Sequence, residues 1–178
     1  MASSTSTLIP FTILTTFLFF SSISASPSSS EPTIPRREML DAFSAQMLAA
    51  HNAVRARHRL PRLTWSTKLA NYAKWYANQR RKDCRLVHST GDYGENIFWG
   101  QGKRWKGTDA VKDWAAQEVY YDYGRDACMA NRDCLHYTQL VWRSTRRVGC
   151  ARIKCANGDT YVVCEYDPHG NVIGQRPY

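Results

Sequence analysis

The first 30 residues of the 178-residue chain contain no Asp, Glu, Lys or Arg. An apolar stretch at 8–20 is shorter than the roughly 20 residues that a membrane-spanning helix needs. Small residues at 24–26 follow it, as signal peptidase requires. We therefore expect residues 1–25 to form a secretory signal peptide, with an uncleaved membrane anchor as the alternative.

Several chemical signatures are also missing. The chain has no Asn-x-Ser/Thr sequon, no G-x-S-x-G nucleophile motif, no H-E-x-x-H zinc motif and no phosphate-binding glycine loop. Its six cysteines form an even set, and secretion favours three disulfides, which would leave no thiolate nucleophile. Tyr and Trp interleaved with Arg and Lys would suit nucleic acid, but a secreted, disulfide-bonded chain argues against that partner.

Beyond the leader, a Ser- and Pro-rich stretch at 26–38 predicts a flexible lead-in, and 39–178 predicts one folded domain. Apolar periodicity predicts three helices, the second capped by Ser66 and the third by Thr108. β-forming runs predict strands in the last third. The expected helices span 39–57, 66–82 and 108–121, and the expected strands span 140–143, 147–155 and 161–166. The pattern indicates an α+β or layered domain with helices packed on a small antiparallel sheet.

Hairpin parity constrains the cysteines. A turn at Asn157 places Cys150 and Cys164 opposite each other on one face, within bridging reach. Cys155 points to the other face and needs a different partner. Cys128 and Cys134 suit a local clip, which leaves Cys84 for Cys155. This pairing is one of 15 that six cysteines allow.

Two His and two Glu side chains lie near structural transitions, with Glu118 on the inner face of the third predicted helix: His88, Glu95, Glu118 and His136. Spacing alone does not join them in one site, because ordinary core or surface positions explain them equally well.

The sequence also carries family motifs. Residues 136–142, HYTQLVW, resemble the first signature of the CAP superfamily, which contains cysteine-rich secretory proteins, insect antigen 5 and plant pathogenesis-related group-one proteins. Residues 161–171 resemble its second signature. Residues 51–55, 94–96 and 174–178 resemble the plant branch. The resemblance covers the whole domain from 39 to 178.

This resemblance implies a three-layer α-β-α sandwich with a small antiparallel sheet and the three disulfides argued above. It also implies that the two His and two Glu side chains form a tetrad in a cleft, which in some members binds a divalent metal such as Zn²⁺. Imidazole nitrogen and carboxylate oxygen both suit Zn²⁺. The metal is not expected to be required for the fold.

The resemblance further implies a defence-type, antimicrobial protein that binds a sterol or another lipid. The leader indicates secretion, for which we expect the apoplast, with the vacuole as the alternative, and we expect a monomer. An apolar groove near the tetrad would bind the lipid, and core packing is the alternative for its aromatic wall. The candidate wall consists of Tyr93, Ile97, Phe98, Trp99 and Trp105. A metal-dependent hydrolase using the tetrad is the alternative function.

The C-terminal residues 168–178 resemble a defence peptide that plant relatives release by cleavage between Asp167 and Pro168. Relatives usually carry Asn where this chain has Glu165. An ordered, uncleaved tail is the alternative.

Basic side chains gather in three clusters along the sequence. They indicate either a solvated surface or attraction to anionic cell-wall polymers or microbial membranes, which salt would weaken. The clusters are Arg55, Arg57, Arg59 and Arg62; Arg80, Arg81, Lys82 and Arg85; and Arg143, Arg146 and Arg147.

Overall fold

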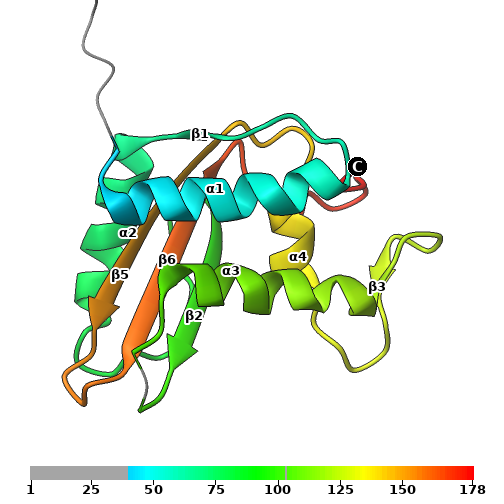
Figure 1. The fold of residues 1–178 in the computed structure, drawn as a ribbon. Coiled ribbons are helices and arrows are strands. Elements are labelled where there is room, and N and C mark those ends of the chain that lie inside the picture. Colours follow the sequence, from blue (N-terminus) through cyan, green and yellow to red (C-terminus); the bar gives the residue numbers. More distant parts are fainter. Residues whose placement is uncertain (1–39, 103) are drawn as a thin grey trace, which may run out of the picture. The chain divides into compact units, whose positions relative to one another are not determined.

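The computed structural model describes residues 40–102 and 104–178, which form a domain of mixed helices and strands (Figure 1). The predicted signal peptide, the whole predicted lead-in and residue 39 lie outside the described residues. The elements are α1 (Ala42–Arg57), β1 (Thr64–Trp65), α2 (Thr67–Gln79), β2 (Gly94–Gly100), α3 (Gly107–Ala116), the 3₁₀ helix η1 (Gln117–Tyr120), β3 (Tyr121–Asp122), β4 (Ala127–Cys128), α4 (Leu135–Leu140), β5 (Arg147–Lys154) and β6 (Thr160–Asp167).

A four-stranded sheet in the order β1-β5-β6-β2 forms the middle layer. β5 and β6 form an antiparallel hairpin, β2 pairs antiparallel with β6, and the short β1 pairs parallel with β5. β3 and β4 form a separate two-stranded ribbon. Helix α2 packs on one face of the sheet, and α1, α3 and α4 pack on the other (Figure 1).

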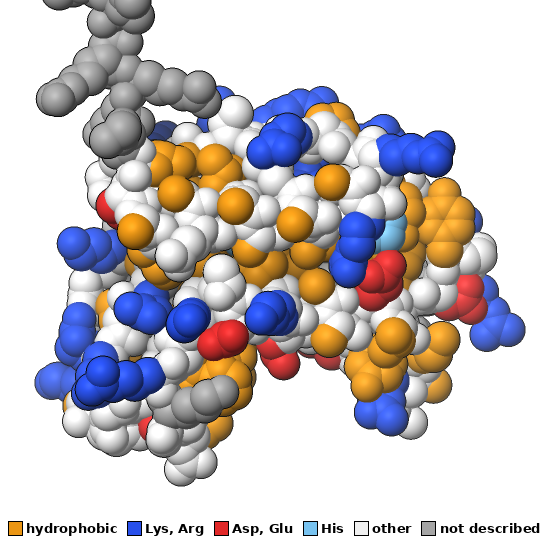
Figure 2. Space-filling model, in the orientation of Figure 1, with side chains coloured by type: hydrophobic (Ala, Val, Ile, Leu, Met, Phe, Trp, Pro, Cys, Tyr) orange, Lys and Arg blue, Asp and Glu red, His pale blue; other side chains and the backbone are white. Residues whose placement is uncertain are grey.

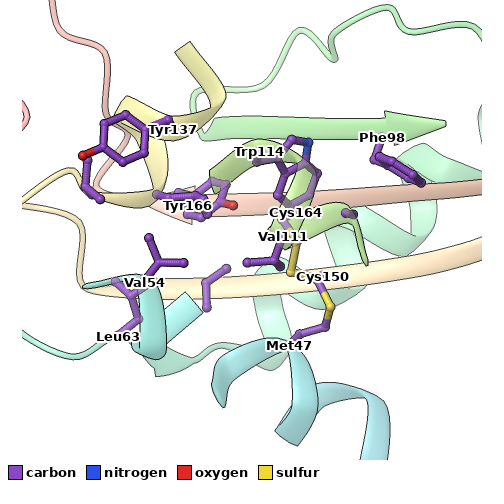
Figure 3. Packing of buried hydrophobic residues seen from close by; sticks show 14 of the residues in the cluster. Met47, Val54, Leu63, Phe98, Val111, Trp114, Tyr137, Cys150, Cys164 and Tyr166 are labelled. Atoms are coloured by element: carbon purple, nitrogen blue, oxygen red, sulfur yellow. A yellow bond between two sulfur atoms is a disulfide. The ribbon is translucent and has the colours of Figure 1, made fainter. Parts of the chain in front are cut away.

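Each face of the sheet carries its own hydrophobic cluster. Alternate residues of β6 point to opposite faces. Val162 and Tyr166 therefore join the cluster under α1, α3 and α4, whereas Val163 joins the cluster under α2. Figure 3 shows Trp114 and Tyr166 packed together in the first cluster beside the disulfide. The predicted α-β-α sandwich is thus present, with one parallel strand added at its edge.

The predicted disulfides are confirmed. Cys150 and Cys164 are direct cross-strand partners, with Cα atoms 4.1 Å apart. The other two bridges join Cys84 to Cys155 and Cys128 to Cys134.

The expected strand at 140–143 is wrong, because α4 ends at Leu140 and a turn follows. Tyr137, Leu140 and Val141 are all buried and have the i, i+3, i+4 spacing of a helical face, which a short apolar run does not distinguish from a strand. Ser66 caps α2 as predicted, but α3 begins one residue before Thr108, and Lys106 is its N-cap.

Within the expected third helix, residues 117–120 form the tighter 3₁₀ helix η1, and Tyr121 already begins β3. Strand β2 was not predicted at all, and it forms the free edge of the sheet opposite β1. Among the described residues, no helix combines the length and the apolar character needed to cross a membrane.

Candidate functional site

His88 and Glu95 form the first part of the candidate site. Glu95 is the second residue of β2, and its Oε1 lies 2.6 Å from Nδ1 of His88 and accepts a 3.0 Å hydrogen bond from the backbone N–H of Ser89. The hydrogen bond between Glu95 and His88 is the main reason that the pKa of His88 is raised. Burial acts to raise the pKa of Glu95, but the hydrogen bonds outweigh it, so that pKa is lowered. The pair therefore favours an imidazolium next to a carboxylate.

Glu165 lies directly behind this pair. It is the cross-strand partner of Glu95 on β6 and is fully buried. Burial, followed by the charge of Glu95, raises the pKa of Glu165 to about 9. Neither oxygen of Glu165 nor Oε2 of Glu95 meets an N–H or O–H donor among the described residues. A protonated Glu165 resolves this, because its own proton can be donated to the Glu95 carboxylate.

His136 is the second imidazole. It lies on the first turn of α4, is partly buried, and stacks on Trp114 with ring centroids 6.3 Å apart. Burial is the main cause that lowers its pKa, and the charge of His88 acts in the same direction. The two imidazoles are therefore close enough to influence each other's charge. His136 is the one that favours the neutral form.

Gln117, not Glu118, approaches His136. The Gln117 side chain contacts Nδ1 of His136 at 2.9 Å and accepts from its backbone N–H at 3.2 Å. The Glu118 carboxylate instead contacts Arg57 at 3.2 Å and His58 at 3.4 Å. Consecutive side chains of a 3₁₀ helix point about 120° apart, so only one of Gln117 and Glu118 can face His136. The prediction that Glu118 joins His88, Glu95 and His136 in one site is therefore wrong.

The predicted four-ligand metal site therefore does not fit as a set. In the described part of the chain, no three of the four predicted ligands have donor atoms that all lie within 4.8 Å of one another. The nitrogen and oxygen donors of His88, Glu95 and His136 have the right chemistry for Zn²⁺, but the neutral amide of Gln117 stands where a fourth charged ligand was expected.

The predicted aromatic wall is also wrong as one surface. Ile97 packs in the cluster under α2, and Phe98 packs in the cluster on the opposite face, since neighbours in a strand alternate. Phe98 packs edge-on against Trp105, with ring centroids 5.3 Å apart, and Tyr93 packs edge-on against Tyr72. Trp99 is more than one-third exposed and donates from its indole to Asp159. Most of these aromatic contacts are ordinary packing.

An apolar groove lies elsewhere, between α1 and α3. Its volume is about 810 Å³, and Figure 2 shows hydrophobic side chains along and between these helices. We call it the helix groove. Its lining comprises Gln46, Ala49, Ala50, Ala53, Val54 and Arg57 of α1, Thr108, Val111, Lys112, Ala115 and Ala116 of α3, and the adjoining Glu118 and Val119.

The two helices that border the helix groove are held together at both ends. Gly107 begins α3 against Phe43 and Met47, where a Cβ atom would clash with both side chains. At the other end, Arg57 pairs with Glu118. The lining residues of α1 follow helical i, i+3, i+4 spacing and so share one face. The alanines among them have side chains too short to fill the gap between α1 and α3.

Sequence reasoning missed two residues of the site, Gln117 and Glu165. The register that places Glu165 opposite Glu95 depends on β2, which was not predicted. The signal available in the sequence was an acidic residue at position 165, inside a strand whose neighbours are all apolar or aromatic. Such a residue must be paired or protonated when it is buried.

The C-terminal tail is docked on α4 and the segment that follows it. The backbone N–H of Gly170 donates to Gln139 at 2.9 Å, and that of Arg143 donates to the carbonyl of Pro177 at 2.6 Å. The hydroxyl of Tyr178 lies 2.9 Å from that of Tyr137. The ordered-tail alternative thus describes this segment before any cleavage.

Arg55 requires a correction, since it belongs to the interior and not to a basic surface cluster. It is fully buried, and its guanidinium donates to the carbonyls of Pro61, Leu140 and Trp142 at 2.8–2.9 Å. Burial lowers its pKa to about 10. The predicted surface cluster loses this member, whereas Arg57, Arg59 and Arg62 are exposed.

Comparison with known proteins places this architecture. Residues 48–166 match the model of the CAP family, described as the cysteine-rich secretory protein family. Pathogenesis-related protein PR-1 of Medicago truncatula is 45% identical over 169 residues, which cover 94% of each chain. Pathogenesis-related protein 1B of Nicotiana tabacum is 50% identical over 131 residues, 74% of this chain and 78% of that relative.

A solved structure agrees with these sequence matches. Venom allergen-like protein 4 of Schistosoma mansoni has a TM-score of 0.64 at 26% identity, and the match covers 78% of this chain and 95% of that one. The chain belongs to the CAP family of cysteine-rich secretory proteins.

Proposed function

We propose that this protein is a secreted, defence-type CAP protein that acts by binding a sterol or another lipid in the helix groove. The similarity to plant proteins named as pathogenesis-related supports the defence role. The observation that carries the binding role is the apolar groove of about 810 Å³ between α1 and α3, a volume within the roughly 300–1,000 Å³ typical of small-molecule sites.

The chemistry of the groove suits an elongated apolar molecule with a polar end. Val54 and Val111 form a buried apolar floor, and exposed Ala49 and Ala53 border its opening. Charged groups are confined to its borders, where Arg57, Lys112 and Glu118 can meet a hydroxyl or carboxyl group. Apolar burial supplies the affinity, so binding should change little with salt.

The test is a titration of the disulfide-intact protein with a fluorescent sterol and with a fatty acid. Ala53→Trp fills the groove from α1 and should abolish saturable binding. Ala45→Trp is the matched control, because Ala45 is exposed on the same helix outside the lining, and it should bind like the unmodified protein. Equal binding by both variants would place the ligand elsewhere, and no binding by the unmodified protein would refute the proposal.

The proposal includes a divalent cation bound at His88, Glu95 and His136. Such a cation would act as a Lewis acid at this site. The two imidazoles would hold the ion, and Glu95 would orient His88 through its hydrogen bond. Calorimetry with Zn²⁺ near neutral pH tests this. Replacing both His88 and His136 with Ala should abolish binding, whereas Glu118→Gln should leave it unchanged because that carboxylate faces Arg57 and His58. No hydrolytic step is assigned to this cluster.

Secretion to the apoplast as a monomer is part of the same proposal. Three disulfides support an oxidising compartment, because such bonds persist outside the reducing cytosol. Amino-terminal sequencing of the secreted protein should begin at Ser26. Gel filtration should give the mass of one chain.

Release of residues 168–178 as a peptide is the last part of the proposal. Pro168 is exposed, so the Asp167–Pro168 bond is reachable by a protease. The contacts of Gly170 and Pro177 with the body of the domain would hold the cleaved segment until they open. Mass spectrometry of wound fluid should detect this 11-residue peptide, and its absence would contradict release.

A further inference from the structure

A second groove lies between α2, the start of α1 and the outer edge of β5. Its volume is about 680 Å³. We call it the basic groove. Its lining comprises Leu40, Asp41, Phe43 and Ser44; Trp65, Thr67, Ala70, Asn71, Lys74, Asn78 and Arg81; and residues 150–154 of β5. Unlike the helix groove, it mixes aromatic, amide and cationic side chains.

Four of the lining residues are exposed cations: Lys74, Arg81, Arg152 and Lys154. In the described part of the chain, none of them forms an ion pair with a carboxylate. Asp41 is the one acidic lining residue. It is committed to the start of α1, where its carboxylate accepts from the N–H and the hydroxyl of Ser44 at 2.8 and 3.0 Å. The groove therefore carries positive charge that the domain itself does not neutralise.

The positive surface continues past the end of β5. A neighbouring hollow of about 570 Å³ shares Arg152 and Lys154 with the basic groove and adds Arg104 and Asn157. Figure 2 shows Lys and Arg side chains gathered at the lower left, over the ends of β5 and α2 in Figure 1. The two hollows thus give a path with cations at intervals, which suits an anionic polymer more than one small anion.

The remaining lining groups favour a carbohydrate. Phe43 and Trp65 are partly exposed aromatic side chains, against which the apolar face of a sugar ring can pack. Asn71 provides an amide that can both donate to and accept from hydroxyl groups. Arginine and lysine can pair with the carboxylate of a uronic acid. An apolar lipid would leave these polar groups without partners.

An extended acidic peptide added to β5 is less suitable. β1 pairs with β5 only at Arg147 and Val148, so the outer edge of β5 is open beyond them among the described residues. At the far end, however, Arg81 donates to the carbonyl of Lys154 at 2.9 Å and accepts from the N–H of Ala156 at 2.9 Å. The open edge is therefore too short for a peptide to add as a strand of usual length.

We propose that the basic groove binds an acidic oligosaccharide of the uronic-acid type. Its cations pair with the carboxylates, and its aromatic and amide side chains contact the sugar rings. This site is separate from the helix groove, which shares no lining residue with it. A protein with both sites can attach to an acidic polysaccharide matrix while its lipid site remains accessible.

Affinity electrophoresis and calorimetry with oligogalacturonate of about ten units test the proposal. The intact protein should bind saturably, and the affinity should fall as salt rises, since ion pairs are screened. Lys74→Gln with Lys154→Gln should weaken binding about tenfold, as two exposed ion pairs of up to about 1 kcal/mol each allow. Both backbone carbonyls keep their hydrogen bonds in this variant, so the fold should be intact.

The control variant, Lys68→Gln with Lys82→Gln, removes the same charge from exposed positions outside both hollows. It should retain most of the affinity. Equal weakening in both double variants would show a general charge effect and overturn the site. Polyglutamate binding as tightly as the oligosaccharide would overturn the sugar assignment. Ala53→Trp should not change this binding, so failure of lipid binding and failure of this proposal are distinguishable.

Discussion

Glu95 and Glu165 face each other across β2 and β6, and the pKa of Glu95 is lowered, whereas burial raises the pKa of Glu165 to about 9. The difference follows from their surroundings. Glu95 has His88 and the N–H of Ser89 as hydrogen-bond donors, whereas Glu165 is fully buried and meets no donor among the described residues. Two carboxylates this close cannot both ionise at low cost, so the pair shares one proton.

Replacing Glu165 with Gln should stabilise the protein at neutral pH. The folded pKa of about 9 lies above the ordinary value near 4.5, so below pH 4.5 both states hold the proton and stability is greatest. As pH rises toward 9, the unfolded chain ionises while the fold does not, and stability is lost. Because Gln cannot ionise, the variant should gain roughly 1–3 kcal/mol at pH 7 and almost nothing at pH 4.

Urea unfolding at pH 4 and pH 7 measures this difference, with a chelator present. Glu118→Gln is the matched control, because Glu118 is a partly exposed carboxylate on the surface and should give little pH-dependent gain. If Glu165→Gln destabilises the fold equally at both pH values, Glu165 is ionised in the native state and the shared proton is absent.

Gln117→Glu should raise the pKa of His136. A carboxylate placed about 3 Å from Nδ1 of His136 would stabilise its charged form, against the burial that now lowers its pKa. The same change should tighten Zn²⁺ binding, because it replaces a neutral amide with an anionic ligand. NMR titration of the imidazole signals and calorimetry measure the two effects.

Glu118→Gln separates the two neighbouring positions. It should leave the pKa of His136 unchanged and lower that of His58, whose charged form Glu118 supports. A shift of His136 in Glu118→Gln instead would restore the original assignment of Glu118 to the cluster.

The disulfides and the hairpin could be predicted from the sequence, because a turn at Asn157-Gly158 and residue parity fix which side chains face each other. The strand at β2 could not. Its seven residues combine glycines at both ends with aromatic residues, and the pairing that makes it a strand comes from β6, more than 50 residues away.

The candidate site was predictable only in part for a related reason. Glu95 and His136 lie in the family motifs at 94–96 and 136–142, whereas His88 lies outside these motifs and was assigned through the family resemblance. The choice between Gln117 and Glu118 depends on where α3 changes to a 3₁₀ helix, since that change sets the direction of every later side chain. Periodicity analysis assumes one period along the whole segment and cannot locate such a change.

Arg55 should be among the least replaceable residues of the domain. Among the described residues it has no carboxylate partner, and its buried guanidinium joins α1 to the carbonyls at 61, 140 and 142. Arg55→Met removes the charge but leaves these carbonyls without donors, so we expect a loss of about 3 kcal/mol in the free energy of unfolding. Arg59→Met, at an exposed position, should cost less than about 0.5 kcal/mol.

Urea unfolding at neutral pH compares these two variants. A near-zero cost for Arg55→Met would mean that water replaces the guanidinium and that the buried hydrogen bonds contribute little.

The disulfides should differ in their contribution to stability according to the loop each one closes. Cys84–Cys155 spans 71 residues, whereas Cys128–Cys134 spans 6. Chain-entropy arguments then give roughly 4 kcal/mol for the long bridge and roughly 2 kcal/mol for the short one.

The long bridge also fixes the end of the segment after α2 to the end of β5, beside the basic groove. Replacing Cys84 and Cys155 with Ala should therefore lower the melting temperature more than replacing Cys128 and Cys134. It should also weaken oligogalacturonate binding, whereas loss of the short bridge should not. Calorimetric melting of both double variants measures the first effect, and the binding assay measures the second. If the short bridge proves the more stabilising, native-state packing around Cys134, not loop entropy, determines the ranking.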